Sequence, residues 1–400
     1  MGFPIIGETF KFMKPHDAFQ LPTFLTEKIL RHGPIFRTSL FGTKVIISTD
    51  IGLNMEVAKK NRIPGSQGLK SRLMQDIDIL ARTHMEIGAK NGGLDIKETA
   101  SKILIECLAK KVMGEMEPEA AKELTLCWRG FPRELFQFSL NIPGNGVYRM
   151  MKARNRMMKI LKEMVLKKRA SGEEFGEFFK IIFGEIEGRE ETMSVKKVIE
   201  YIFTFFLVAN ETTPGVIAAT IKLISDNPRV KQEMQREHER VVRDKTEKEK
   251  ELDLTWEDYK SMTFTHMVIN ESLRITSTAP TMLRINDQEI RVGEYTIPAG
   301  WIVMGYPSVH FNPEKYDDPL VFNPWRWKEK DLGAILTRTY MPFGAGARLC
   351  LGAEFAKFQM AIFIHHLFRY RWSMKTETTV IRRFILMFPN GCDVQISQET

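Results

Sequence analysis

The amino-acid sequence predicts a mainly α-helical protein with a minor β part, folded as a single domain over residues 1–400. Three observations predict this class. Apolar residues recur at the helical period through much of residues 51–275, and residues 198–225 are apolar on nearly every side, as expected of a central helix. Short alternating stretches near both ends of the chain indicate strands. With 43% hydrophobic and 27% charged residues, the composition is ordinary for a globular protein with a large core.

The predicted elements follow in order along the chain. We expect mostly strands and loops in residues 1–50, 280–310 and 375–400, and mostly helix in residues 51–275 and 352–372. Within these regions, residues 34–50 alternate like two strands around a Phe-Gly-Thr turn. Residues 98–114 and 149–169 are amphipathic helices with basic outer faces, separated by the helix-breaking stretch IPGNG.

Three local signals refine the second half of the chain. Residues 243–253 (RDKTEKEKELD) are expected to be a solvated, charged linker. Thr255 and Asp258 have the spacing of a capping box and predict a new helix start. Residues 382–396 are expected to close the chain as a hairpin.

Charge and cysteine content restrict the class of function. The net charge is +8, but the basic residues are scattered, so nucleic-acid binding is disfavoured and a basic face for an acidic protein or an anionic membrane is favoured instead. No apolar run reaches ~20 residues, so we expect no membrane span. The four cysteines, Cys107, Cys127, Cys350 and Cys392, lack zinc-site spacing, so any special thiol acts alone.

Polar residues interrupt the most apolar helix in the stretch VANETTP. Glu211, Thr212 and Thr213 place a carboxylate and two hydroxyls where an apolar helix would have none, and Pro214 removes a backbone donor and should loosen the turn before it. Two interpretations remain open. The threonine hydroxyls bond to their own helix backbone, or a widened turn holds water and passes protons.

A charged pair lies on the helix that contains ESLR. Glu271 and Arg274 are three residues apart on one helix face and can pair, although most such pairs only decorate a surface. Arg326, in the later stretch FNPWRW, can complete a carboxylate held by two guanidinium groups. The sequence therefore suggests a buried ionic cluster.

The most specific pattern is MPFGAGARLCLGAEF, residues 341–355. It reads Phe343-x-x-Gly346-x-Arg348-x-Cys350-x-Gly352. The glycines let the backbone approach a flat ligand, the arginine can bind a carboxylate, and the helix that follows should lower the pKa of the cysteine thiol. A single thiolate on a planar macrocycle is haem chemistry.

These three patterns, in this order, resemble the cytochrome P-450 family of haem-thiolate monooxygenases. Three stretches are similar in sequence to the plant branch that oxidises sterols, brassinosteroids and triterpenes: FLVANETTP, LTWEDYKSMTFTHMVINESLR and YTIPAGW. Within that branch they most resemble the group around crucifer thalianol hydroxylase. The likeness runs from about Gly2 to the end of the chain.

The resemblance implies a haem b cofactor and a set of residues that hold it. Cys350 would be the axial metal ligand, Phe343 would shield its sulfur, and Gly346 and Gly352 would permit the close approach. Arg284 and Arg348 would bind the haem propionates. Glu211 and Thr212 would relay protons as the catalytic pair, and Glu271, Arg274 and Arg326 would form the buried structural triad.

The resemblance also places the substrate contacts. They fall on six apolar residues, Phe205, Val208, Ala279, Met282, Ile385 and Leu386. Such a lining suits a large apolar polycycle. Ala209 stands where the family usually has glycine, which still leaves room over the haem.

Compared with the family pattern, two pieces are absent. The family's N-terminal membrane helix would end just before GFPIIGETF, where this chain starts. After Asn61 the chain passes directly to residues that resemble the segment beyond the family's Trp/His-x-x-x-Arg helix. We therefore expect part of the region between the second and fourth helices to be missing, including part of the pocket roof and a haem-contacting basic residue.

The resemblance implies an enzyme that hydroxylates a triterpenoid or steroid with O2 and with electrons from an NADPH-cytochrome P-450 reductase, on the cytosolic face of the endoplasmic reticulum membrane. No nucleic-acid partner is expected. The alternative is a shortened, catalytically impaired relative that folds with weak or no haem binding. A haem-thiolate isomerase is a third interpretation, but Glu211 and Thr212 argue against it because such enzymes need no proton relay.

Overall fold

The computed structural model describes residues 7–58, 70–114, 118–129, 143–179, 194–247, 253–278, 282–285, 288–292, 295–306, 308–330, 339–346 and 349–398. It is mainly helical with four small sheets, as the sequence predicts. Two of the predicted site residues, Ala279 and Arg348, lie outside the described residues.

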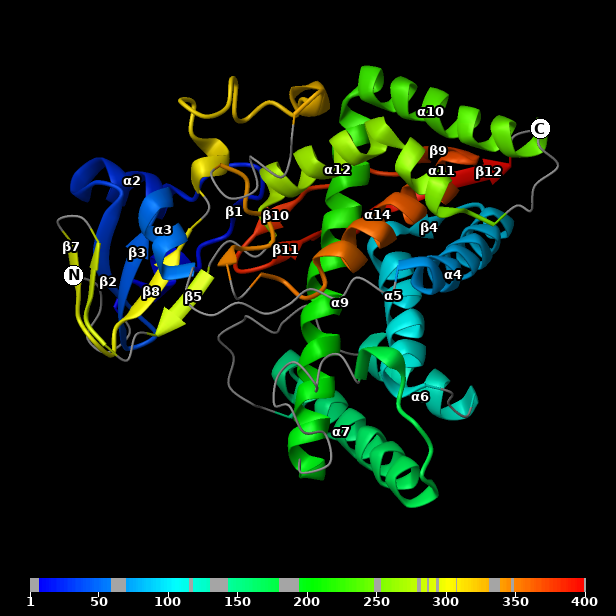
Figure 1. Ribbon diagram of the computed structural model, residues 1–400, viewed down its shortest axis with the longest axis horizontal. Helices are drawn as coiled ribbons and strands as arrows, with labels where there is room; N and C mark the ends of the chain where they lie inside the picture. Colours follow the sequence, from blue (N-terminus) through cyan, green and yellow to red (C-terminus); the bar gives the residue numbers. More distant parts are fainter. Residues whose placement is uncertain are drawn as a thin grey trace.

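A small β-rich region at one end of the molecule combines the first part of the chain with residues 282–305 (Figure 1). Its sheet has the order β2-β3-β8-β5, in which only the β3–β8 pair is parallel. The elements here are α1 (Thr9–Phe12), α2 (Thr23–His32), β2 (Ile35–Leu40), β3 (Thr43–Ser48), α3 (Ile51–Ala58), β5 (Met282–Ile285) and β8 (Ile302–Gly305), with the ribbon β6 (Ile290–Val292) and β7 (Tyr295–Ile297) beside them. The predicted hairpin over residues 34–50 is thus confirmed as β2 and β3.

The larger part of the molecule is helical. Its helices are α4 (Lys70–Lys90), α5 (Ile96–Met113), α6 (Pro118–Arg129), α7 (Gly146–Ser171), α9 (Val195–Asp226), α10 (Pro228–Glu247), α11 (Trp256–Ser261), α12 (Thr263–Thr276) and α14 (Ala353–Phe368), with the short 3-10 turns η2 (Ser308–Phe311) and η3 (Pro324–Trp327). Helix α9 runs through the middle of the molecule, and α6 and α7 lie at its lower end (Figure 1).

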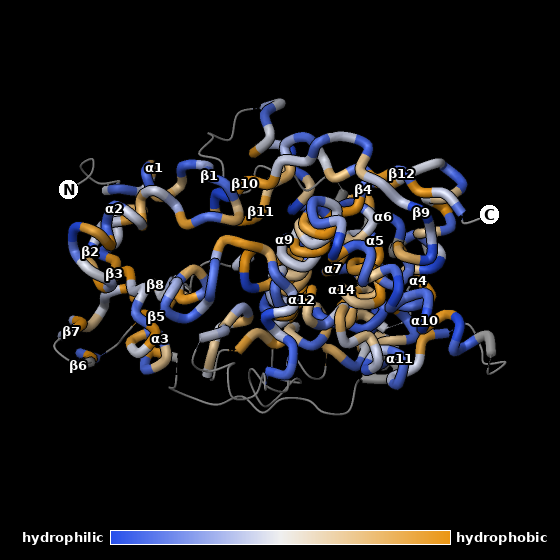
Figure 2. The backbone as a smooth tube through the Cα atoms, turned by 90° about the horizontal axis from the view of Figure 1, so that it is seen from above, coloured by the Kyte–Doolittle hydropathy of each residue, from blue (hydrophilic) through white to orange (hydrophobic). Residues whose placement is uncertain are grey.

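The apolar pattern explains why α9 is central. Most of its second half is buried, from Thr213 to Ile224, and it contributes to one large core together with α4, α5, α12 and α14. In Figure 2 the apolar stretches of α9, α12 and α14 gather in the interior, while hydrophilic stretches lie mainly toward the outside. Helix α9 is the one described helix that is long and apolar enough to cross a membrane, but 61% of its most apolar window is buried in the protein. We read it as a core helix.

Two further sheets complete the fold. One has the order β1-β10-β11 and the other β4-β12-β9. Their strands are β1 (His16–Asp17), β4 (Leu94–Asp95), β9 (Tyr370–Met374), β10 (Ile381–Arg382), β11 (Leu386–Met387) and β12 (Asp393–Gln398). The predicted hairpin over residues 382–396 is therefore only partly right. Strands β10 and β11 pair with each other, but the chain turns at Gly391, which has a φ of 76°, and β12 joins β9 and β4 instead.

Two other predictions need comment. The capping box is confirmed, because Thr255 and Asp258 bond reciprocally at the start of α11. The charged linker predicted over residues 243–253 is wrong for residues 243–247, since α10 continues to Glu247, and residues 248–252 lie outside the described residues. The extension of α10 is stabilised by Lys245, whose side chain is buried and lies 2.8 Å from the carboxylate of Asp258.

Candidate functional site

Glu271, on α12, lies at the centre of a buried ionic cluster. The Arg274 guanidinium donates two hydrogen bonds to its carboxylate, from Nε to Oε2 at 2.9 Å and from Nη2 to Oε1 at 2.8 Å. Arg326, on η3, adds a third from Nε to Oε1 at 2.9 Å. The side chains of Glu271 and Arg274 are fully buried. The structure thus brings the three predicted residues together.

The rest of the cluster satisfies the remaining polar groups. The Trp327 indole N–H and the Asn323 amide N–H also donate to Glu271, at 2.9 Å and 3.0 Å. Arg274 donates from Nη1 to the carbonyls of His310 and Pro319 at 2.6 Å and 2.7 Å. The two guanidinium groups thus share one carboxylate, and neutral backbone carbonyls accept hydrogen bonds from their remaining N–H groups. Asn323 and Trp327 belong to the FNPWRW stretch, where the sequence analysis singled out only the arginine.

His310, on η2, connects this cluster to the cysteine loop. Its Nε2 accepts a hydrogen bond from the amide of Met341 at 3.0 Å, and its Nδ1 lies 3.0 Å from the Ser277 hydroxyl. Because Nε2 faces a donor, the ring is neutral and carries its proton on Nδ1. Burial, with Arg274 nearby, lowers the pKa of His310 to about 3. A lone histidine in a loop gives no sequence signal for this role.

The loop around Cys350 is a tight turn before α14. The Cys350 amide donates to the Phe343 carbonyl at 3.0 Å, and Gly346 takes a φ of 66°, in the left-handed region that favours glycine. A Cβ on Gly352 would lie 3.9 Å from the Cys350 sulfur, so the backbone comes close to the thiol. The Phe343 ring is half-buried, with the Lys357 ammonium 5.8 Å from its centroid.

The predicted lowering of the thiol pKa is wrong for the protein by itself. The structure raises the pKa of Cys350, because surrounding protein atoms desolvate the thiolate more than the Gly352 N–H, the lowering contribution, stabilises it.

The surroundings of Cys350 fit a flat apolar ligand. The residue is exposed, and its neighbours Leu349 and Leu351 are 55% and 47% exposed, which is unusual for two leucines beside a core helix. An apolar ring placed on the sulfur would cover such side chains. The residues present therefore fit a thiolate-bound haem.

Glu211 and Thr212 lie on one uninterrupted helix. The Thr212 hydroxyl donates to the carbonyls of Val208 at 3.0 Å and Ala209 at 3.5 Å, so the local interpretation describes this state and the widened turn is not seen. Burial raises the pKa of Glu211, and Lys97 on α5, with its ammonium 3.9 Å from the carboxylate, opposes that rise. Nothing in the sequence connected Lys97 with this glutamate.

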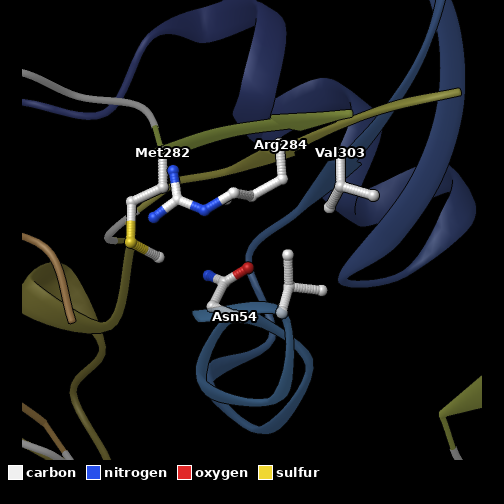
Figure 3. A pocket seen from close by; sticks show the side chains of 6 residues that line it. Asn54, Met282, Arg284 and Val303 are labelled. Atoms are coloured by element: carbon white, nitrogen blue, oxygen red, sulfur yellow. The ribbon is translucent and has the colours of Figure 1, made fainter. Parts of the chain in front are cut away.

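The predicted substrate residues have different environments. Phe205 and Ile385 are half-buried, whereas Val208 is 57% exposed. Leu386 is fully buried and packs on α9, since its Cβ would lie 3.6 Å from a Cβ built on Gly215. Met282 and Arg284, from β5, line a narrow pocket with Asn54, Val57, Val303 and Gly305 (Figure 3).

A thiol in a glycine-rich turn, a central helix with an acid and a threonine, and a buried Glu–Arg–Arg cluster are the features in which this chain resembles the haem-thiolate oxygenases. The chain matches the cytochrome P450 family over residues 65–391 and belongs to that family. Its members are monooxygenases, a class of oxidoreductase.

Several plant enzymes are similar over nearly the whole chain. Cytochrome P450 708A2 of Arabidopsis thaliana is 34% identical over 441 residues, covering 100% of this chain and 91% of the relative. Cucurbitadienol 11-hydroxylase of Siraitia grosvenorii is 29% identical, covering 99% of this chain and 92% of the relative. Cholesterol 16,22-dihydroxylase of Trigonella foenum-graecum is 28% identical, covering 100% and 92%.

The fold is also that of a solved structure, retinoic acid bound cyanobacterial CYP120A1. The TM-score is 0.77 at 20% identity, with 100% of this chain and 98% of that chain covered.

The alignments bear on the expected internal gap. The match with cytochrome P450 708A2 extends over 441 positions although this chain has 400 residues. The relative therefore has residues inside the aligned span that this chain lacks. The family match begins at residue 65, directly after the place where the gap is expected.

Proposed function

We propose that this protein is a monooxygenase that hydroxylates a large apolar substrate, a triterpenoid or a steroid, using O2 and electrons from an NADPH-cytochrome P-450 reductase. The observation that carries the proposal is the exposed Cys350 thiol in its glycine turn, flanked by two exposed leucines. The substrate class is supported by the printed activities of two relatives, which act on cucurbitadienol and on cholesterol.

Haem b, once bound, supplies the oxygen activation that no side chain can provide. In our proposal Cys350 ligates its iron, Phe343 shields the sulfur, and Gly346 and Gly352 keep the backbone out of the way. Arg284 and Arg348 would bind the two carboxylates of the haem.

Proton delivery is assigned to Glu211 and Thr212. Burial raises the pKa of the Glu211 carboxyl, so it holds a proton more strongly than an exposed glutamate and is suited to a general-acid role. Lys97, with its ammonium 3.9 Å away, opposes that rise. The Thr212 hydroxyl would have to exchange its bond to the Val208 carbonyl for one to water, so the relay needs a local rearrangement of α9.

The substrate is proposed to contact the six apolar residues assigned from the sequence. They are Phe205, Val208, Ala279, Met282, Ile385 and Leu386. For Leu386, which is fully buried, contact requires that its side chain move away from α9. We further propose the cytosolic face of the endoplasmic reticulum membrane as the location, in keeping with the membrane-bound plant members of the family.

A second candidate function is a shortened relative that folds with weak or no haem binding and does not turn over. The observation that favours it is the alignment length, since relatives carry internal residues that this chain lacks. Fewer propionate contacts would speed haem loss, because each hydrogen bond to a charged group contributes about 1.5–3 kcal/mol.

One experiment separates the two candidates. The purified protein is reconstituted with haem, reduced under CO, and assayed with NADPH, a plant reductase and a panel of triterpenoid alcohols and sterols. A thiolate-type CO spectrum with turnover supports the enzyme. Folded protein without turnover supports the impaired relative, whether it gives a thiolate-type spectrum or none. Turnover contradicts the impaired relative.

The internal gap is tested by insertion. A loop and helix typical of the family are placed between Asn61 and Gly65, and haem retention and turnover are compared with those of the parent chain. We expect both to improve. Equal values would mean that the parent chain is a compact, complete monooxygenase.

A further inference from the structure

The narrow pocket between α3, β5 and β8 contains an unsatisfied buried acceptor. Asn54, on α3, is 3% exposed, and its Oδ1 accepts no hydrogen bond from the described residues. Leaving a buried carbonyl oxygen unpaired costs about 1–3 kcal/mol. Such an atom calls for a donor in the working state of the protein.

The orientation of the Asn54 amide is fixed by its other end. Nδ2 donates to the backbone carbonyls of Ser48 at 3.3 Å and Tyr306 at 3.4 Å. Both partners are acceptors, so the nitrogen must face them and the oxygen must face the pocket. Figure 3 shows the oxygen pointing into the space below the Arg284 side chain.

The sheet register places the donor in the same pocket. Met282 and Arg284 are two residues apart on β5, so they share one face of the strand, while Leu283 between them is 47% exposed. Opposite Met282 on β8 is Gly305. A Cβ at Gly305 would lie 2.9 Å from Asn54 Oδ1, so this position needs glycine for the amide to fit.

Arg284 is the one guanidinium group among the residues that line this pocket. In the present state its Nη1 donates to the carbonyl of its neighbour Leu283 at 2.9 Å, which holds the guanidinium beside β5. A guanidinium that binds a carboxylate bidentately has further N–H groups to place, and a neutral acceptor beside it fixes the orientation of the fork.

We propose that Asn54 is a positioning residue for the cofactor: its Oδ1 accepts a hydrogen bond from Arg284 and so aims the rest of that guanidinium at a haem carboxylate. This inference rests on the proposed haem-binding role of Arg284. The proposal supplies a hydrogen-bond donor for an oxygen that is otherwise buried without one among the described residues. It also connects α3, the last described element before the expected gap, with cofactor retention.

The test is a double-mutant cycle on haem retention. The ferric, haem-loaded protein is mixed with excess apomyoglobin, and the rate of haem transfer is followed by absorbance for the parent, Asn54→Ala, Arg284→Ala and the double variant. We expect Arg284→Ala to speed haem loss about tenfold or more, and Asn54→Ala by a smaller factor of about three to ten. In the Arg284→Ala background, Asn54→Ala should add nothing, because it acts through the arginine. Val57→Ala, which changes an apolar wall of the same pocket, is the matched control and should leave the rate unchanged.

The outcomes distinguish the two proposals. If Arg284→Ala leaves haem loss unchanged, the haem-binding role of Arg284 is wrong and the inference falls with it. If Arg284→Ala acts but Asn54→Ala has the same effect in both backgrounds, Asn54 has a merely structural role and only the inference is overturned. Should Asn54→Ala not fold, Asn54→Ser replaces it, since the shorter side chain withdraws the Oδ1 acceptor but keeps a hydroxyl that can donate to a backbone carbonyl. Haem loss at the parental rate in that variant overturns the inference, and faster loss that disappears in the Arg284→Ala background supports it.

Discussion

The Glu271 cluster and the Cys350 loop are both polar sites, but only the first is complete within the protein. In the cluster, the carboxylate accepts hydrogen bonds from two arginines, an indole and a backbone amide, and two of its charged side chains are fully buried. In the loop, the thiol is exposed between two exposed leucines, and the structure raises its pKa.

The difference separates folding from function. A cluster whose polar groups are hydrogen-bonded by its own neighbours needs no ligand, but removing the shared carboxylate leaves buried charges unpaired. A thiol surrounded by exposed apolar surface gains its partner only when a ligand binds. Substitutions in the two regions should therefore fail in different ways.

The largest effect is expected in the cluster. Glu271→Ala leaves Arg274 and Arg326 as two buried like charges, which should cost about 3–5 kcal/mol and yield insoluble or haem-free protein. Glu289→Ala, which breaks the exposed ion pair with Arg291 at 3.2 Å, is the control and should cost less than about 1 kcal/mol. Urea unfolding of the soluble fraction measures both. A stable, haem-loaded Glu271→Ala variant would show that the cluster does not support the fold.

In the loop we expect loss of the cofactor signal without loss of the fold. Cys350→Ala should abolish the thiolate-type Soret band of the reduced CO complex and change the urea midpoint little, since the side chain is exposed. Cys127→Ala, at a buried cysteine, should keep the band. If Cys350→Ala retained it, another residue would be the ligand.

The two interpretations of Thr212 predict different results for Thr212→Ala. If the hydroxyl only bonds to its own helix, the variant couples NADPH use to product as the parent does. We expect instead that reducing equivalents are diverted to hydrogen peroxide, because a general acid–base contribution of about 10²–10⁴-fold is lost. Thr204→Ala removes the same kind of bond on α9, from its hydroxyl to the Glu200 carbonyl at 2.7 Å, and should not change the coupling.

The smallest effect concerns His310, which joins the two regions. The unfolded chain gains a proton here as the pH falls below 6.5, whereas the folded protein stays neutral until about pH 3. The free energy of unfolding should therefore fall with pH in this window, by about 1.4 kcal/mol per pH unit. His310→Gln should remove that share of the slope in urea unfolding between pH 7 and pH 5. An unchanged slope would contradict a neutral, buried His310.

The sequence by itself determined the class of the fold and its most specific site. Helical periodicity predicts α5, α7 and α9, because a helix must hide an apolar stripe wherever it packs. The pattern around Cys350 identifies the family, because a thiolate ligand needs glycine backbone close to it. Both signals are local, and a local signal can be read along the chain.

Only the tertiary structure decided what each polar group contacts. It brings Trp327 and Asn323 to Glu271, Lys97 to Glu211, and His310 between the cluster and the loop. It also reverses the expected pKa shift of Cys350 and pairs β12 with strands remote in sequence. Burial and pairing depend on elements far apart in the chain, so no single stretch of sequence contains them. Desolvation, hydrogen bonding and charge pairing are therefore decided only when those elements pack together.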